Sequence, residues 1–215
     1  AYPRHVTEAV ALAKLARVLA AHPAFVEGVR AFLTGGDAPR RVQFVIGNHD
    51  AELAFPAVQR MLSEAIGVPG VWFPGFAVDI GDLRIEHGSQ GDAMFQVDEN
   101  APFTTWKGET LLDLPWGAVA VIDVMLPLQA QLYALDRVKP RARVFELLPE
   151  VKDVLSAAFW RYWTREYLVD LFNRSDPTRK ASWAMLKEVL YRFTTFDPDV
   201  AASAHYHRLV GEQDR

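Results

Sequence analysis

The sequence predicts an α/β fold in which a long helical insertion interrupts a core of strands and helices. A short β-branched strand is followed by an amphipathic helix and a hairpin, residues 101–193 are helical in character, and a short strand lies near the C-terminus. Structureless loops of that length are uncommon in a compact domain. We therefore expect a core of residues 1–100 and 196–215 and a helical insertion or cap of residues 101–195.

Helical patterns occupy three stretches of the N-terminal part. Apolar residues recur at helical spacing over residues 6–20, and the pattern resumes over about 25–33 after His22-Pro23 interrupts it. A third amphipathic helix is expected over about 54–66, where Gly67 closes it. These helices would cover the strands of the core.

Strand patterns occur at three places. Residues 41–46 read Arg-Val-Gln-Phe-Val-Ile, which is typical of a short buried strand, and the run stops at Gly47. Residues 76–86 alternate on either side of Gly81-Asp82, a pair that favours a hairpin turn. A last strand is expected over about 200–204.

The composition restricts the kinds of site that the chain can hold. Half of the residues are hydrophobic and 23% are charged, which is typical of a globular protein with a full core. There are no cysteines, so disulfides and thiolate zinc sites are excluded, and any metal must be held by His, Asn, Asp or Glu. The net charge of -4 gives no reason to expect nucleic-acid binding.

The chain carries no clear membrane signal. Residues 1–17 lack the basic segment and apolar block of a signal peptide. The most apolar stretch, residues 116–128, contains Asp123 and Pro127 and is shorter than the roughly 20 apolar residues that span a bilayer. We therefore expect a buried helix there and a cytoplasmic location for the protein.

Histidines cluster at the ends of the predicted strands. Gly47-Asn48-His49-Asp50 follows the first strand, His87 follows the hairpin, and His205-Tyr206-His207 follows the last strand. In open α/β sheets, sites form beyond the carboxyl ends of the strands. Neutral imidazole is a common metal ligand, and the carbonyl oxygen of Asn can join it around a divalent ion. Each histidine taken alone has a plainer interpretation, as a hydrogen-bonded structural residue at the end of a strand.

Three of these segments resemble the motifs of calcineurin-like metallophosphoesterases, in that family's order. Val-Ile-Gly-Asn-His-Asp, residues 45–50, is similar to the Gly-Asn-His-Asp/Glu block of the family. Glu86-His87-Gly88 resembles its middle histidine motif, and Ala204-His205-Tyr206-His207 resembles its closing Gly-His-x-His. The resemblance covers about residues 40–92 and 198–209, and it implies a partial metallophosphoesterase β-sandwich core flanked by helices.

The resemblance implies a set of metal ligands. It assigns Asn48, His87 and His205 to one ion and His207 to a second. The two divalent ions would be manganese, iron or zinc, held about 3.5–4 Å apart, and they would activate a hydroxide that attacks phosphorus. The substrate would be a small-molecule phosphate mono- or diester.

Two further residues would take part in catalysis. The resemblance places His49 beside the leaving oxygen as a general acid, with Asp50 fixing the orientation of its ring. As an alternative from the residues alone, Asp50 caps the helix that follows. We expect glycine at position 47 because a sharp turn out of a strand often needs a positive φ.

The chain departs from the family pattern in two ways. Ala204 stands where the family usually has glycine, and residues 1–46 contain neither the Asp-x-His nor the strand-terminal Gly-Asp of the family. The expectation is that the chain is a fragment of a phosphoesterase and is inactive by itself. The alternatives are a non-catalytic scaffold that retains the fold and a metal-binding module that uses Asn48, His87 and His205.

Overall fold

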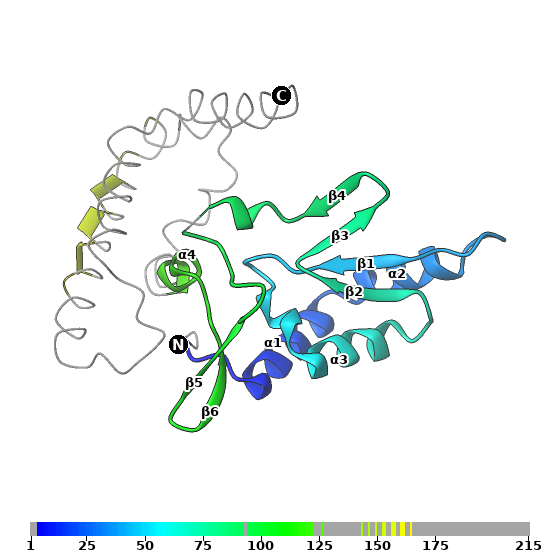
Figure 1. The fold of residues 1–215 in the computed structure, drawn as a ribbon, viewed down its shortest axis with the longest axis horizontal. Coiled ribbons are helices and arrows are strands. Elements are labelled where there is room, and N and C mark those ends of the chain that lie inside the picture. The colour runs from blue at the N-terminus through cyan, green and yellow to red at the C-terminus, as the bar shows by residue number, and fades with distance from the viewer. Residues whose placement is uncertain are drawn as a thin grey trace. The chain divides into compact units, whose positions relative to one another are not determined.

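The computed structural model of the chain describes residues 4–92 and 94–122. Beyond them it describes only the following positions: 126, 143, 146, 149, 152, 153, 156, 157, 160, 161 and 164. Residues up to Ile122 belong to one compact unit, which contains both helices and strands, as an α/β fold requires (Figure 1).

Helices α1 (Glu8–Ala21) and α2 (Pro23–Thr34) match the first two predicted helices. The Oγ1 atom of Thr7 accepts a hydrogen bond from the backbone N–H of Val10, at 3.3 Å, which caps the start of α1. Pro23 is the first residue of α2, where its missing N–H removes no helical hydrogen bond. Only His22 lies between the two helices.

Helix α3 (Pro56–Ile66) matches the third predicted helix and buries Val58, Leu62 and Ile66. It ends at Gly67, which adopts a left-handed φ of 72° while its N–H bonds the Ser63 carbonyl at 2.8 Å. A 3-10 helix, η1 (Ala51–Ala54), precedes α3. The helix and its glycine stop are thus confirmed.

Strand β1 (Val42–Val45), which the sequence predicts, pairs in parallel with β2 (Val71–Gly75), which it does not. The register joins Val42 to Val71 and Val45 to Gly75, with an irregularity between them. The apolar run of β2 is short, and it ends in a proline and a glycine, which weaken a strand pattern. Its pairing with β1 fixes the position at which the chain leaves β1.

Strands β3 (Ala77–Ile80) and β4 (Leu83–Glu86) form the expected hairpin. They pair antiparallel, with Val78 opposite Ile85, and Gly81 takes the left-handed φ of 60° that the turn requires. The hairpin ends one residue before His87. Ala77 and Val78 of β3 are half-buried, whereas the rest of β3 and all of β4 are exposed.

The prediction of helix is wrong for residues 103–112. This stretch forms a second hairpin, made of β5 (Phe103–Trp106) and β6 (Glu109–Leu112). Lys107 and Gly108 both have a positive φ, of 52° and 83°, which is the conformation of a tight hairpin turn.

The β5–β6 hairpin belongs to the same compact unit as the N-terminal helices. The N–H of Leu112 donates to the carbonyl of Val6 at 2.8 Å, and the ring of Phe103 lies 4.7 Å from that of Phe55. A short helix, α4 (Trp116–Ala120), follows the hairpin, as the apolar run there indicates. Most of the rest of the predicted cap, and the last predicted strand, lie outside the described residues.

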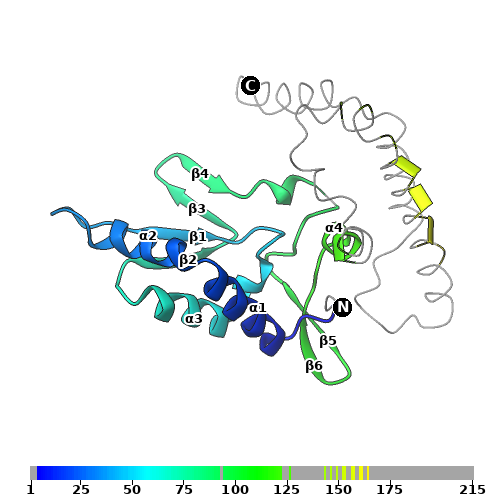
Figure 2. The same cartoon turned by 180° about the vertical axis from the view of Figure 1, so that it is seen from behind.

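The core of the unit lies among α1, α3, η1 and β6. Figures 1 and 2 show the two hairpins on opposite sides of the β1–β2 pair. The most deeply buried large side chains of the described part are Ile66, Leu111, Leu112, Val6, Val58, Val97 and Val119. The hairpin that the sequence did not predict therefore supplies central core residues.

We predict that Leu112→Ala destabilises the protein by about 2–5 kcal/mol, because it leaves a cavity in this core. Leu83→Ala is the matched control, since Leu83 is 59% exposed and Leu112 fully buried, and its effect should stay within about 0.5 kcal/mol. Urea unfolding followed by tryptophan fluorescence measures both free energies. Equal losses in the two variants would mean that β6 is not part of the core.

Candidate functional site

The segment Gly47-Asn48-His49-Asp50 begins directly where β1 ends. The N–H of Ile46 donates to the carbonyl of Gly75 at 2.8 Å, so pairing with β2 holds the chain up to the residue before Gly47. Gly47 and Asn48 are buried, whereas His49 and Asp50 are exposed. The first half of this segment therefore lies inside the protein, and the second half lies at its surface.

Asp50 closes the segment into a tight loop. Its Oδ1 accepts a hydrogen bond from the backbone N–H of Gly47 at 2.6 Å, and its carbonyl accepts one from Leu53 at 2.9 Å. The carboxylate makes no capping hydrogen bond to η1, so the expected capping role is not observed. Within the described part of the chain, no hydrogen bond joins Asp50 to the ring of His49. The observed function of Asp50 is to hold the loop.

His87, directly after β4, lies against the start of this loop. A Cβ atom added to Gly47 would lie 2.5 Å from Cδ2 and 3.0 Å from Nε2 of the His87 ring. Glycine is therefore needed at position 47 because the imidazole approaches the backbone closely. The expected reason, a positive φ, is wrong, since Gly47 is absent from the glycines with positive φ.

Asn48 is the one buried polar or charged residue in the described part of the chain, at 6% exposure. No hydrogen bond to its side chain occurs among the described residues. Its amide is not completely enclosed, so its oxygen and nitrogen stay accessible to water or to a ligand. Asn48 follows directly on Gly47, the residue beside which the His87 ring lies.

The other two predicted ligands, His205 and His207, lie outside the described residues. Within residues 4–92 and 94–122 and the isolated positions beyond, no group of three or more His, Cys, Asp or Glu side chains could hold a metal ion. The structure thus brings Asn48 near His87, and the ligand set as a whole stays a prediction.

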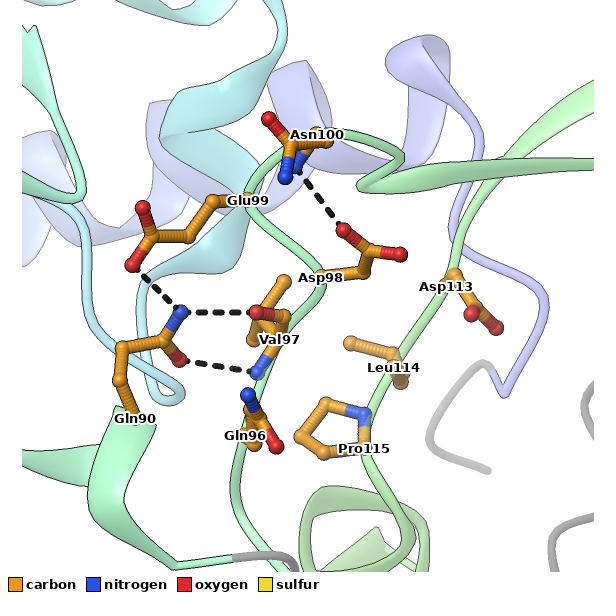
Figure 3. Close-up of a pocket in the computed structure, with 9 residues that line it drawn as sticks. All are labelled: Gln90, Gln96, Val97, Asp98, Glu99, Asn100, Asp113, Leu114 and Pro115. Carbon is orange, nitrogen blue, oxygen red and sulfur yellow. Dashed lines mark hydrogen bonds between the residues drawn. The ribbon is translucent and has the colours of Figure 1, made fainter.

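The chain after His87 is tied down by side-chain hydrogen bonds to its backbone. The amide of Gln90 donates to the carbonyl of Val97 at 2.8 Å and accepts from its N–H at 3.0 Å (Figure 3). Asp92 accepts from the N–H of Met94 at 2.9 Å, so Asp92 orders this loop. These contacts border a polar pocket of about 460 Å³, whose lining includes Asp98, Glu99 and Asp113.

A second, apolar cavity opens beside His49. Its volume is about 350 Å³, and His49 and Asp50 line it together with side chains of α1, α2, β1, η1 and α3. The apolar spacing of residues 6–20 placed several of these side chains on one helix face. That spacing does not reveal which strand the face meets, so the cavity could not be predicted from the sequence.

Comparisons with family models, with curated proteins and with solved structures gave no match. In the described part of the chain no single helix has the length and apolarity to cross a membrane; α1 and α2 meet those criteria only together, as a pair bent by 83°.

We predict that Gly47→Ala displaces the His87 ring and costs about 1–3 kcal/mol, because the new methyl group overlaps the imidazole. Gly91→Ala is the control, since a Cβ at Gly91 meets nothing within 4 Å. Imidazole NMR resonances of His87 and the free energy of unfolding measure the two effects. An unchanged His87 resonance in Gly47→Ala would show that the ring does not rest on Gly47.

Removing the loop-closing acceptor should also be costly. Asp50→Ala leaves the N–H of Gly47 without its partner, which we expect to cost about 1–3 kcal/mol. Asp50→Asn keeps an acceptor oxygen at that place and should lose less. Amide hydrogen exchange at Gly47 measures the effect locally, and equal exchange rates in both variants would contradict the structural role of Asp50.

Proposed function

We propose that this chain carries part of a dinuclear metal site of the calcineurin-like metallophosphoesterase type, and that the enzyme hydrolyses phosphate mono- or diesters. The observation that carries the proposal is the position of Asn48, which has no side-chain hydrogen bond among the described residues and follows the glycine that the His87 ring contacts. In the proposal, the amide oxygen of Asn48 and an imidazole nitrogen of His87, which follow different strands, bind one divalent ion. In the proposal, the strands belong to a partial β-sandwich core.

The donor set is compatible with metal binding. His87 has no hydrogen bond among the described residues, so its ring nitrogens are not engaged by protein groups there. Its ring is exposed while Asn48 is buried, which provides access from solvent on one side and a fixed ligand on the other. Two bound divalent ions, of manganese, iron or zinc, would supply water activation and neutralise phosphoryl charge.

The protein residues have separate roles in this proposal. Asn48 and His87 bind metal together with His205, and His207 serves the second ion. The exposed His49 holds the proton that the leaving oxygen receives. Asp50 acts by holding the loop that presents both Asn48 and His49, through its hydrogen bond to Gly47.

The chief rival is a metal-binding module or scaffold without catalytic activity. It is favoured by one observation, the lack of Asp-x-His in residues 1–46, because two ions need bridging carboxylate charge. The phosphoesterase proposal therefore requires bridging carboxylate ligands other than residues 1–46.

Metal binding is tested directly with Mn²⁺, which broadens NMR resonances of nearby nuclei even at a weak site. We expect selective broadening of the Asn48 side-chain amide and the His87 ring, while His5 and His22 keep their line widths. His87→Ala should abolish the broadening at Asn48, and His22→Ala, a histidine outside the proposed site, should not. Broadening that spares Asn48 and His87 would exclude both metal-binding proposals.

Hydrolysis separates the enzyme from the module. In a protein that joins this chain to the upstream carboxylate motifs, His87→Ala should lower Mn²⁺-dependent hydrolysis of bis-p-nitrophenyl phosphate more than about 100-fold, since loss of even a supporting residue costs 10–100-fold. Retained turnover would remove His87 from the ligands. Metal binding without any turnover in that protein would favour the module.

A further inference from the structure

The apolar cavity beside His49 is bounded by five elements of the described unit, α1, α2, β1, η1 and α3. Its wall includes Leu15, Val18 and Leu19 of α1, Phe25 of α2 and Phe44 of β1. Val18 and Phe25 are both about half exposed, so the cavity opens to solvent between the helices. Its volume of about 350 Å³ lies within the range of small-molecule sites.

The charged groups of the cavity already have partners. Lys14 forms an ion pair with Glu52, and the carboxylate of Asp50 accepts the N–H of Gly47. His49 makes no hydrogen bond among the described residues. The cavity therefore offers a ligand an apolar wall and an imidazole at one side, on the same loop as Asn48.

We infer that this cavity binds an apolar leaving group of a phosphate ester, an alkyl or aryl chain. The inference rests on the proposed function, because it takes the phosphate to lie at Asn48 and His87. In the reaction, water forms a new bond to phosphorus and releases a proton. The bond from phosphorus to the leaving oxygen breaks, and that oxygen takes a proton from the imidazolium of His49, so an apolar alcohol leaves.

A hydrophilic leaving group does not suit this wall. Hydroxyl groups of a sugar would be buried against Leu15, Leu19 and Phe44 without hydrogen-bond partners, which is unfavourable. An alkyl chain gains free energy from the same surface, in proportion to the apolar area that it removes from water. The position of His49 at the cavity directs the polar end of such a ligand toward the loop.

The test is a titration of this chain, without metal, with ethyl, butyl, hexyl and octyl phosphonate, whose P–C bond is not hydrolysed. We expect the affinity to rise about threefold to fourfold for each methylene, until the cavity is filled. The imidazole resonances of His49 and the methyl resonances of Leu15 and Leu19 should shift along the series. Calorimetry and NMR measure the affinity and the site.

Two matched variants locate the effect. Val18 and Ile80 are exposed to nearly the same extent, 53% and 55%, but only Val18 lines the cavity. Val18→Gln should weaken octyl phosphonate severalfold and flatten the dependence on chain length, and Ile80→Gln should leave both unchanged. Both variants change a surface residue, so both should fold.

Different results overturn the inference and the proposed function. A flat series, or an equal effect of Val18→Gln and Ile80→Gln, would overturn the assignment of the cavity. A series in which His49 does not shift would also overturn it, because the chain would then bind elsewhere. Failure of the proposed function has a separate readout, the lack of Mn²⁺ broadening at Asn48 and His87.

Discussion

The imidazole of His87 rests on the backbone of Gly47, and the candidate site depends on this contact. It joins the end of β4 to the end of β1, two strands that belong to different sheets and share no hydrogen bonds. The contact is possible because residue 47 has no Cβ atom, so a ring can occupy the space beside the chain. It determines where a ligand from the hairpin meets the loop after β1.

The loop itself is held by a single carboxylate, while a nearby amide is left without a partner. Asp50 accepts the N–H of Gly47 and so keeps the turn closed. Asn48, inside that turn, is buried without a hydrogen bond among the described residues. Its amide is therefore not engaged by a described protein group and stays accessible to a bound ligand.

The same loop also meets an apolar environment. Asn48 is buried beside the residue that His87 contacts, whereas His49 is exposed and lines the cavity between α1, α2 and β1. A loop of this kind can bring a metal-bound phosphate and an apolar group of one substrate to adjacent places. In the proposed function, the helices that line the cavity would select the substrate, and the residues after the strand ends would supply the chemistry.

Local patterns in the sequence were enough to predict α1, α2, α3, β1 and the β3–β4 hairpin, because each depends on short-range spacing and on a stop such as Gly67 or a turn such as Gly81-Asp82. They also identified Asn48 and His87 as candidates.

Tertiary structure decided what local patterns do not contain. The strand β2 forms because β1 pairs with it, and β5–β6 forms where its residues complete the core around Val6 and Leu112. The need for glycine at position 47 comes from a ring forty residues away. A contact between distant segments has no signature in either segment alone. The spacing of the motifs could therefore indicate a metal site, but only the fold brought His87 to Gly47.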